Sequence, residues 1–124
     1  MDNDKLNNLT KLFYSVKEVS EMFSITPDTL RYWENQFDVI QPVRKARGIR
    51  AYRPEDIEGV KAVYYLLKEK KMTVSGAQKM LRDQRDAVYR KSEAIRRLRE
   101  VRAELKRIIK EFDDMPDSDT DELS

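Results

Sequence analysis

The sequence predicts a mainly α-helical protein that carries a small two-stranded β-ribbon and ends in one long helix. Three observations lead to this fold class. Apolar residues recur at helical spacing in several segments, residues 39–52 lack that spacing and contain Pro42 and Gly48, and residues 86–112 contain neither proline nor glycine. With 124 residues, the chain is expected to form one small domain and an extension.

The composition argues against several classes of function. The chain has no cysteine and no histidine, which excludes disulfides, thiolate metal sites and histidine acid–base chemistry. Its three glycines form no phosphate-cradling loop and no nucleophile–base pair is visible, so we predict neither an enzyme nor a bound metal or cofactor. The start lacks a signal-peptide pattern, and no apolar run approaches the roughly 18 residues of a membrane span. We therefore expect a cytoplasmic protein without membrane contact.

The charge is distributed unevenly along the chain. The last 12 residues hold six of the 23 acidic residues and none of the 25 basic ones, so residues 1–112 carry a net charge of +8. This balance favours a polyanionic partner. A soluble, charge-dense helical protein without such a partner is the alternative.

The first expected elements are a flexible arm and a capped helix. Residues 1–12 are polar and are expected to form the flexible N-terminal arm. Ser15 followed by Glu18 fits a capping box, which predicts a helix from Val16. Exposed N–H groups at this helix start could contact the DNA backbone near Ser15 and Lys17, although capping alone also explains Ser15.

A second helix is expected to follow after a short turn. Thr26 before Pro27 is a favourable helix start, and the helix should run to about Phe37. Two helices joined by a three-residue turn form the helix-turn-helix pattern, which many helical hairpins share.

The stretch "TPDTLRYWENQF" over residues 26–37 has two unlike faces. Its apolar side, with Leu30, Trp33 and Phe37, is expected to pack against the first helix. Its polar side is expected to enter the major groove of DNA, as second helices of this motif do. The candidates for reading base edges are Asp28, Thr29 and Asn35, and the candidates for holding phosphates are Arg31 and Tyr32. Asp28 in the first turn equally fits a helix stabiliser.

Residues 39–52 predict a two-stranded ribbon with its turn near Arg47 and Gly48. Five basic residues fall within ten positions and no acidic residue lies among them. The ribbon is therefore expected to act as a wing that grips phosphates, while a merely solvated basic loop is the alternative. The basic residues are Arg44, Lys45, Arg47, Arg50 and Arg53.

Two helices are expected after the ribbon. The first begins at Pro54 and carries an apolar stripe to the lysines at 68–71, with Gly59 as a mild liability of about 1 kcal/mol relative to alanine. Thr73 is expected to cap the second, with Val74 and Ala77 facing inward.

Residues 86–112 predict one long helix with a heptad seam. Arg102 and Lys91 interrupt the seam, which can set the register of a self-associating coiled coil. The alternative is a single helix that folds back on its own domain. The acidic residues 113–124 are expected to be disordered, as either a solubilising tail or a competitor of DNA for the wing. The seam residues are Val88, Ile95, Leu98, Val101, Leu105, Ile108, Ile109 and Phe112.

Several of these motifs occur together in a known order. The "TLRYWE" helix, the "GIRAY" wing followed by "RPEDI", and a Lys-Met-Thr turn make residues 13–82 similar to the MerR family of transcriptional regulators. The resemblance implies a winged helix-turn-helix DNA-binding domain at residues 13–82 and an antiparallel dimerisation helix at 86–112. It also implies a homodimer on a near-palindromic double-stranded DNA operator, with RNA polymerase as a partner at the promoter. Many such regulators distort that DNA.

The resemblance assigns roles to individual positions. It implies phosphate binding by Arg31 with Tyr32 as the neighbouring aromatic, and it matches the wing arginine and closing aromatic to Arg50 and Tyr52. The chain departs from the family at Ile49, where an aromatic is common, and at Trp33, which is typical of one subgroup. It also lacks the cysteines and the extra domain that sense effectors, so a short form without an effector domain is predicted.

Two other function classes stay open on the sequence alone. An architectural DNA-binding protein would bind with salt dependence but without sequence choice, and a helical adaptor would use its coiled coil and acidic tail to bind proteins. The sequence does not indicate the operator, the regulated genes, the sign of regulation or any ligand.

Overall fold

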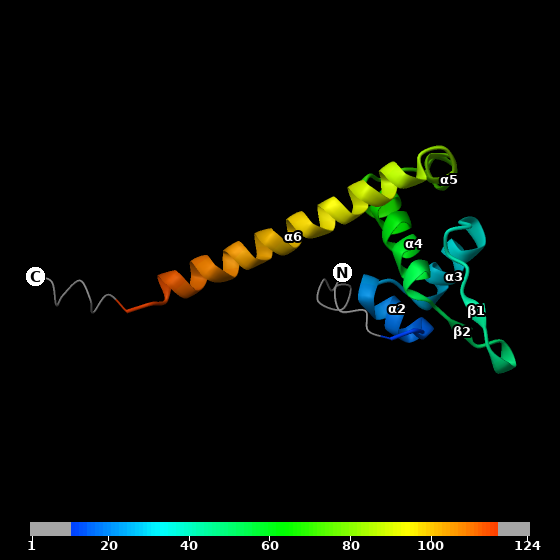
Figure 1. Cartoon of the computed structure of the whole chain (residues 1–124), viewed down its shortest axis with the longest axis horizontal. Coiled ribbons are helices and arrows are strands. Elements are labelled where there is room, and N and C mark those ends of the chain that lie inside the picture. The colour runs from blue at the N-terminus through cyan, green and yellow to red at the C-terminus, as the bar shows by residue number, and fades with distance from the viewer. Residues whose placement is uncertain (1–10, 117–124) are drawn as a thin grey trace, which may run out of the picture. The chain divides into compact units, whose positions relative to one another are not determined.

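The computed structural model describes residues 11–116, so most of the expected N-terminal arm and acidic tail, residues 1–10 and 117–124, lies outside the described residues. The chain divides into two compact units with the boundary after Glu93. Short helices and a β-ribbon make up the first unit, and the long last helix runs into the second (Figure 1). The helices are α2 (Val16–Phe23), α3 (Pro27–Gln36), α4 (Pro54–Tyr64), the π-helix η2 (Tyr65–Glu69), α5 (Val74–Asp83) and α6 (Arg85–Asp113). The ribbon consists of β1 (Val43–Arg44), the short 3₁₀ turn η1 (Ala46–Gly48) and β2 (Arg50–Ala51).

The helix-turn-helix at α2 and α3 has the caps that the sequence predicts. Ser15 Oγ accepts a hydrogen bond from Glu18 N at 3.1 Å, and Glu18 Oε1 accepts one from Ser15 N at 3.2 Å, which completes the capping box. Thr26 Oγ1 accepts from Thr29 N at 3.1 Å at the start of α3. Ser24 ends α2 in the left-handed region, with φ of 53°. These local bonds satisfy backbone groups that the helix ends leave open.

The core of the first unit lies under α3. Leu30, Trp33 and Phe37 are at most 3% exposed, as predicted for the apolar side of this helix. Tyr64 of α4 contacts both neighbouring helices: its ring centroid is 5.9 Å from that of Phe23 and 6.4 Å from that of Trp33, the latter edge-on. Such tilted aromatic pairs add to the stabilisation from burial. The core therefore fixes α3 with its polar side outward.

Gly59 is a requirement of the packing and not the mild liability expected from helix propensity. A Cβ atom at this position would lie 2.2 Å from the carbonyl oxygen of Val39, a backbone atom of the segment that leads to the ribbon. Only glycine allows α4 and this segment to approach so closely.

A buried carboxylate holds the same segment to the start of α4. Asp56 is 2% exposed. Its Oδ1 accepts from Gln41 N at 3.1 Å, and its Oδ2 accepts from Arg53 N at 2.9 Å and from Arg53 Nε at 3.1 Å. Asp56 therefore caps the start of α4 and also bonds to the segment before the ribbon.

The helix after the ribbon does not continue uniformly to the lysines as expected. Its last turn widens into η2, where Lys70 N donates to Tyr65 O at 2.9 Å, and Lys71 adopts a φ of 54°. Tyr65 and Leu66, neighbours in sequence, are both buried in this wider turn.

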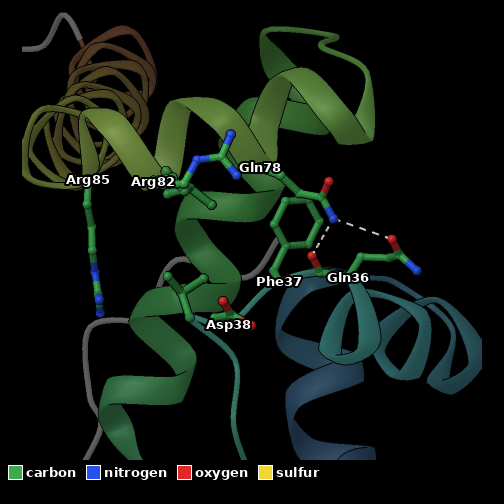
Figure 2. Close-up of a pocket in the computed structure, with 8 residues that line it drawn as sticks. Gln36, Phe37, Asp38, Gln78, Arg82 and Arg85 are labelled. Carbon is green, nitrogen blue, oxygen red and sulfur yellow. Dashed lines mark hydrogen bonds between the residues drawn. The ribbon is translucent and has the colours of Figure 1, made fainter.

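A hollow of about 500 Å³ lies between the end of α3 and α5. Gln78 Nε2 donates to the carbonyl oxygen of Gln36 at 2.7 Å and lies 3.4 Å from the Gln36 side-chain oxygen, so α5 is bonded to the last turn of α3. Figure 2 shows Phe37 beside this bond, with Arg82 of α5 and Arg85 at the start of α6 also lining the hollow.

Helix α6 is uninterrupted over 29 residues, close to the predicted range. In the second unit its apolar residues are exposed, and ion pairs such as Arg107 with Glu104 and Glu111 run along it. The residues of the predicted seam that are 47–73% exposed are Leu98, Val101, Leu105, Ile108, Ile109 and Phe112, and Ile95 is partly exposed. Val88 differs, because it is 4% exposed in a single chain. Its assignment to the seam is wrong, since its side chain is already covered.

Candidate nucleic-acid interface

The polar side of α3 is open to solvent. Asp28 and Arg31 have side chains 93% and 53% exposed, Tyr32 is 50% exposed, and Asn35 is exposed as well. Arg31 Nη1 lies 3.8 Å from Asp28 Oδ1, a surface pair too weak to hold the guanidinium in place. Four polar side chains spaced at i, i+3, i+4 and i+7 thus share one accessible face above a buried apolar one.

Thr29 is half-buried, so it is less accessible than these four side chains. Its Oγ1 lies 2.9 Å from Thr26 Oγ1, and its N–H donates to the same oxygen. The hydroxyl of Thr29 is therefore bonded within the cap of α3.

The start of α2 brings Ser15 and Lys17 to the surface. Ser15 already uses its hydroxyl and its N–H in the capping box, and Lys17 is exposed. Lys11 Nζ lies 2.6 Å from Glu18 Oε2. This contact with Lys11, followed by the N–H of Ser15, lowers the pKa of Glu18, and the same carboxylate raises the pKa of Lys11.

The ribbon has the predicted form and turn. Val43 pairs with Ala51 and Arg44 with Arg50 in antiparallel register. Arg47 and Gly48 turn the chain with φ of 62° and 72°, in the left-handed region that glycine adopts at no cost. In Figure 1 this turn lies at the end of the ribbon away from the helices.

Three basic side chains of the ribbon are exposed: Arg44, Lys45 and Arg47. Lys45 Nζ lies 4.2 Å from the centre of the Phe13 ring, a cation–π contact with the segment before α2. Together with Lys17 and Arg31, these groups give the first unit accessible positive charge on α2, α3 and the ribbon.

Tyr52 was assigned to the DNA surface, and that assignment is wrong. The residue is fully buried, and its hydroxyl donates a hydrogen bond to Glu34 Oε1. Burial, and then the bond to Glu34, raise the pKa of Tyr52 far above its ordinary value. Its backbone forms a two-way bridge with Tyr14, with both N···O distances at 2.8 Å. A side chain with no exposed surface contacts the core and not DNA.

Arg50 also faces inward. Its side chain is 17% exposed, and its Nε lies 2.8 Å from Oε2 of Glu34, whose side chain is 6% exposed. The contact is an ion pair without the alignment of a directed hydrogen bond. Glu34 was not among the residues singled out from the sequence. The available signal was its spacing, because it falls four residues after Leu30 and three before Phe37, on the apolar side of α3, where a carboxylate needs a partner.

The described residues hold neither a candidate metal site nor a candidate membrane span. Within residues 11–116, no group of three acidic, cysteine or histidine side chains lies close enough together to hold a metal ion. No helix in this range is both long and apolar enough to cross a bilayer.

Comparison with known proteins gives two results. Residues 14–84, more than half of the chain, match the family described as MerR HTH family regulatory protein. The HTH-type transcriptional regulators ZntR of Escherichia coli K12 and of Escherichia coli O157:H7 are each 36% identical to this chain over 50 residues. The match covers 40% of this chain and 36% of each relative, so the chain aligns with about a third of their length. No solved structure matches.

Proposed function

The chain belongs to the MerR family of helix-turn-helix regulatory proteins, and we propose on this premise that it binds a near-palindromic DNA operator as a homodimer. Membership makes it a DNA-binding transcription regulator, in a family of regulators and not of enzymes. The observation that carries the proposal is the two-faced α3, whose exposed polar side stands on a buried apolar one. The proposed ligand is duplex DNA, and the proposed location is the cytoplasm.

In this proposal α3 enters the major groove by its N-terminal turn. Asn35 and Asp28 read base edges, since an amide suits adenine and a short carboxylate suits cytosine. Arg31 and Tyr32 hold phosphates and fix the register without reading sequence. Thr29 contributes through the cap of α3, where its hydroxyl is already bonded, so it orients the turn that meets the bases.

The exposed bases of the ribbon are proposed to neutralise backbone phosphates. Arg44, Lys45 and Arg47 are accessible and lie around a tight turn. Each phosphate contact makes the slope of log affinity against log salt more negative by about 0.9 on duplex DNA. Lys17 and the α2 start are proposed to add a further backbone contact.

The proposed dimer forms through α6. An apolar stripe that is about half exposed or more on a single chain marks an interaction surface. Its repeat, with acidic and basic residues beside it, is typical of a coiled coil. A two-fold dimer matches an operator with inverted half-sites. RNA polymerase at a distorted promoter is the further partner that we propose, by the family's mode of action.

Selection of bound duplexes from a random pool, using the purified full chain, tests the proposal. An enriched inverted repeat is expected, and its spacer length will show whether the dimer can reach both half-sites. Retention of DNA with strong salt dependence but no motif would favour an architectural protein. Absence of retention even at low salt would favour a protein–protein adaptor.

A further inference from the structure

One carboxylate of α3 contacts two side chains of the wing. Glu34 lies on α3 next to Trp33, and its side chain is 6% exposed. One of its oxygens accepts a hydrogen bond from the Tyr52 hydroxyl, and the other pairs with Arg50 Nε at 2.8 Å. Glu34 thus bonds to both inward-facing wing side chains.

The strand geometry explains why both side chains reach Glu34. Alternate residues of a strand point to the same face, so Arg50 and Tyr52 share one face and Ala51 takes the other. The Tyr14 bridge fixes the backbone at Tyr52. Glu34 then fixes the face of the ribbon that turns toward α3.

We propose that Glu34 is a positioning residue for DNA binding, and that Arg50 holds the wing to α3 instead of binding phosphate. The inference rests on the proposed function and deepens it, because it concerns how α3 and the ribbon, the two elements proposed to contact DNA, are held at a fixed distance from each other. A buried carboxylate that loses its cation is strongly disfavoured. If the Arg50 side chain turned toward a phosphate, the buried carboxylate of Glu34 would lose its cation. The exposed side chain of Arg47 can bind phosphate without breaking such a pair.

Two variants that each remove one positive charge, Arg50→Gln and Arg47→Gln, show whether Arg50 binds phosphate or holds the wing. Salt slopes are measured with the selected duplex, or with random duplex if no motif emerges. For Arg50→Gln we expect about tenfold weaker binding at every salt concentration with an unchanged slope, a typical coupling within one network. In the control Arg47→Gln the loss of one phosphate contact should make the slope less negative by about 0.9. A slope that becomes less negative by about 0.9 in Arg50→Gln would overturn the proposal.

Removing the acid at Glu34 changes DNA affinity in opposite directions, depending on whether Glu34 acts only through its charge or positions the wing. Glu34→Gln takes a negative charge from a DNA-binding surface, so simple electrostatics predicts tighter binding, as expected for the exposed control Glu55→Gln. A positioning role predicts about tenfold weaker binding, and predicts that the double variant Glu34→Gln/Arg50→Gln loses no more than either single one. Tighter binding by Glu34→Gln, or full additivity, would contradict it.

A distance measurement tests the positioning without DNA. The chain has no cysteine, so Ala46→Cys on the ribbon turn and Lys79→Cys on α5 accept spin labels at only those two sites. We expect Glu34→Gln to broaden the label–label distance distribution while circular dichroism and Trp33 fluorescence show a folded protein. An unchanged distribution would overturn the inference. Arg50→Gln serves in its place if Glu34→Gln fails to fold, and a chain that binds no DNA would refute the proposed function while this measurement still decides on Glu34.

Discussion

For Gly59→Ala, helix propensity predicts a more stable protein and the packing in the structure predicts a less stable one. By propensity alone, the change stabilises an α-helix interior by about 1 kcal/mol. In this fold the added Cβ would lie 2.2 Å from Val39 O and 2.8 Å from Val39 C, and both are backbone atoms. Accommodating it requires α4 and the Val39 segment to separate, and overpacking of this kind costs about 1–3 kcal/mol or more.

We therefore expect net destabilisation by Gly59→Ala, with the packing cost exceeding the gain in propensity. For a domain of this size each 1 kcal/mol lowers the melting temperature by about 4–8 °C. The measurement is thermal unfolding followed by circular dichroism, at one protein concentration because the proposed dimer would make stability depend on concentration.

Gly76→Ala in α5 is the matched control. Its Cβ would lie 3.1 Å from Thr73 Oγ1, the atom that caps α5 by accepting from Gly76 N. A shift of a few tenths of an ångström relieves this contact, so we expect a change within about 1 kcal/mol. A Gly59→Ala protein that melts higher than the wild type would refute the packing argument and show that the Val39 segment yields freely.

Three further predictions concern the core, the dimer and the helix start. Trp33→Ala should cost about 3–5 kcal/mol and unfold the first unit; a folded variant that merely loses DNA binding would show that Trp33 is not core. Leu105→Glu should give monomers in sedimentation equilibrium, since each chain loses the stabilisation of up to about 3 kcal/mol that comes from burying this leucine in the dimer. The control Lys106→Glu, outside the predicted seam, should stay dimeric. The lowered pKa of Glu18 means that its stabilisation is present above its ordinary value of 4.5 and is lost as the pH falls through the lower folded-state value. The melting difference between wild type and Glu18→Gln should accordingly shrink in acid, and a constant difference would rule out the ionised pair with Lys11.

The local elements of this protein could be predicted because each depends on neighbours in the chain. The capping box at Ser15, the cap at Thr26 and the turn at Arg47–Gly48 involve residues within a few positions of one another. The two faces of α3 follow from helical spacing alone. These signals were enough for the fold class and for the exposed candidates Arg31, Tyr32 and Asn35.

Only the tertiary structure decided which residues far apart in the sequence contact one another. Glu34 and Tyr52 are 18 positions apart, so nothing local showed that a wing aromatic would be buried on a recognition-helix carboxylate. The close approach of Val39 to Gly59 and the burial of Val88 are of the same kind. Periodicity gives the face on which a residue lies, but whether another element covers that face depends on the packing of the whole domain.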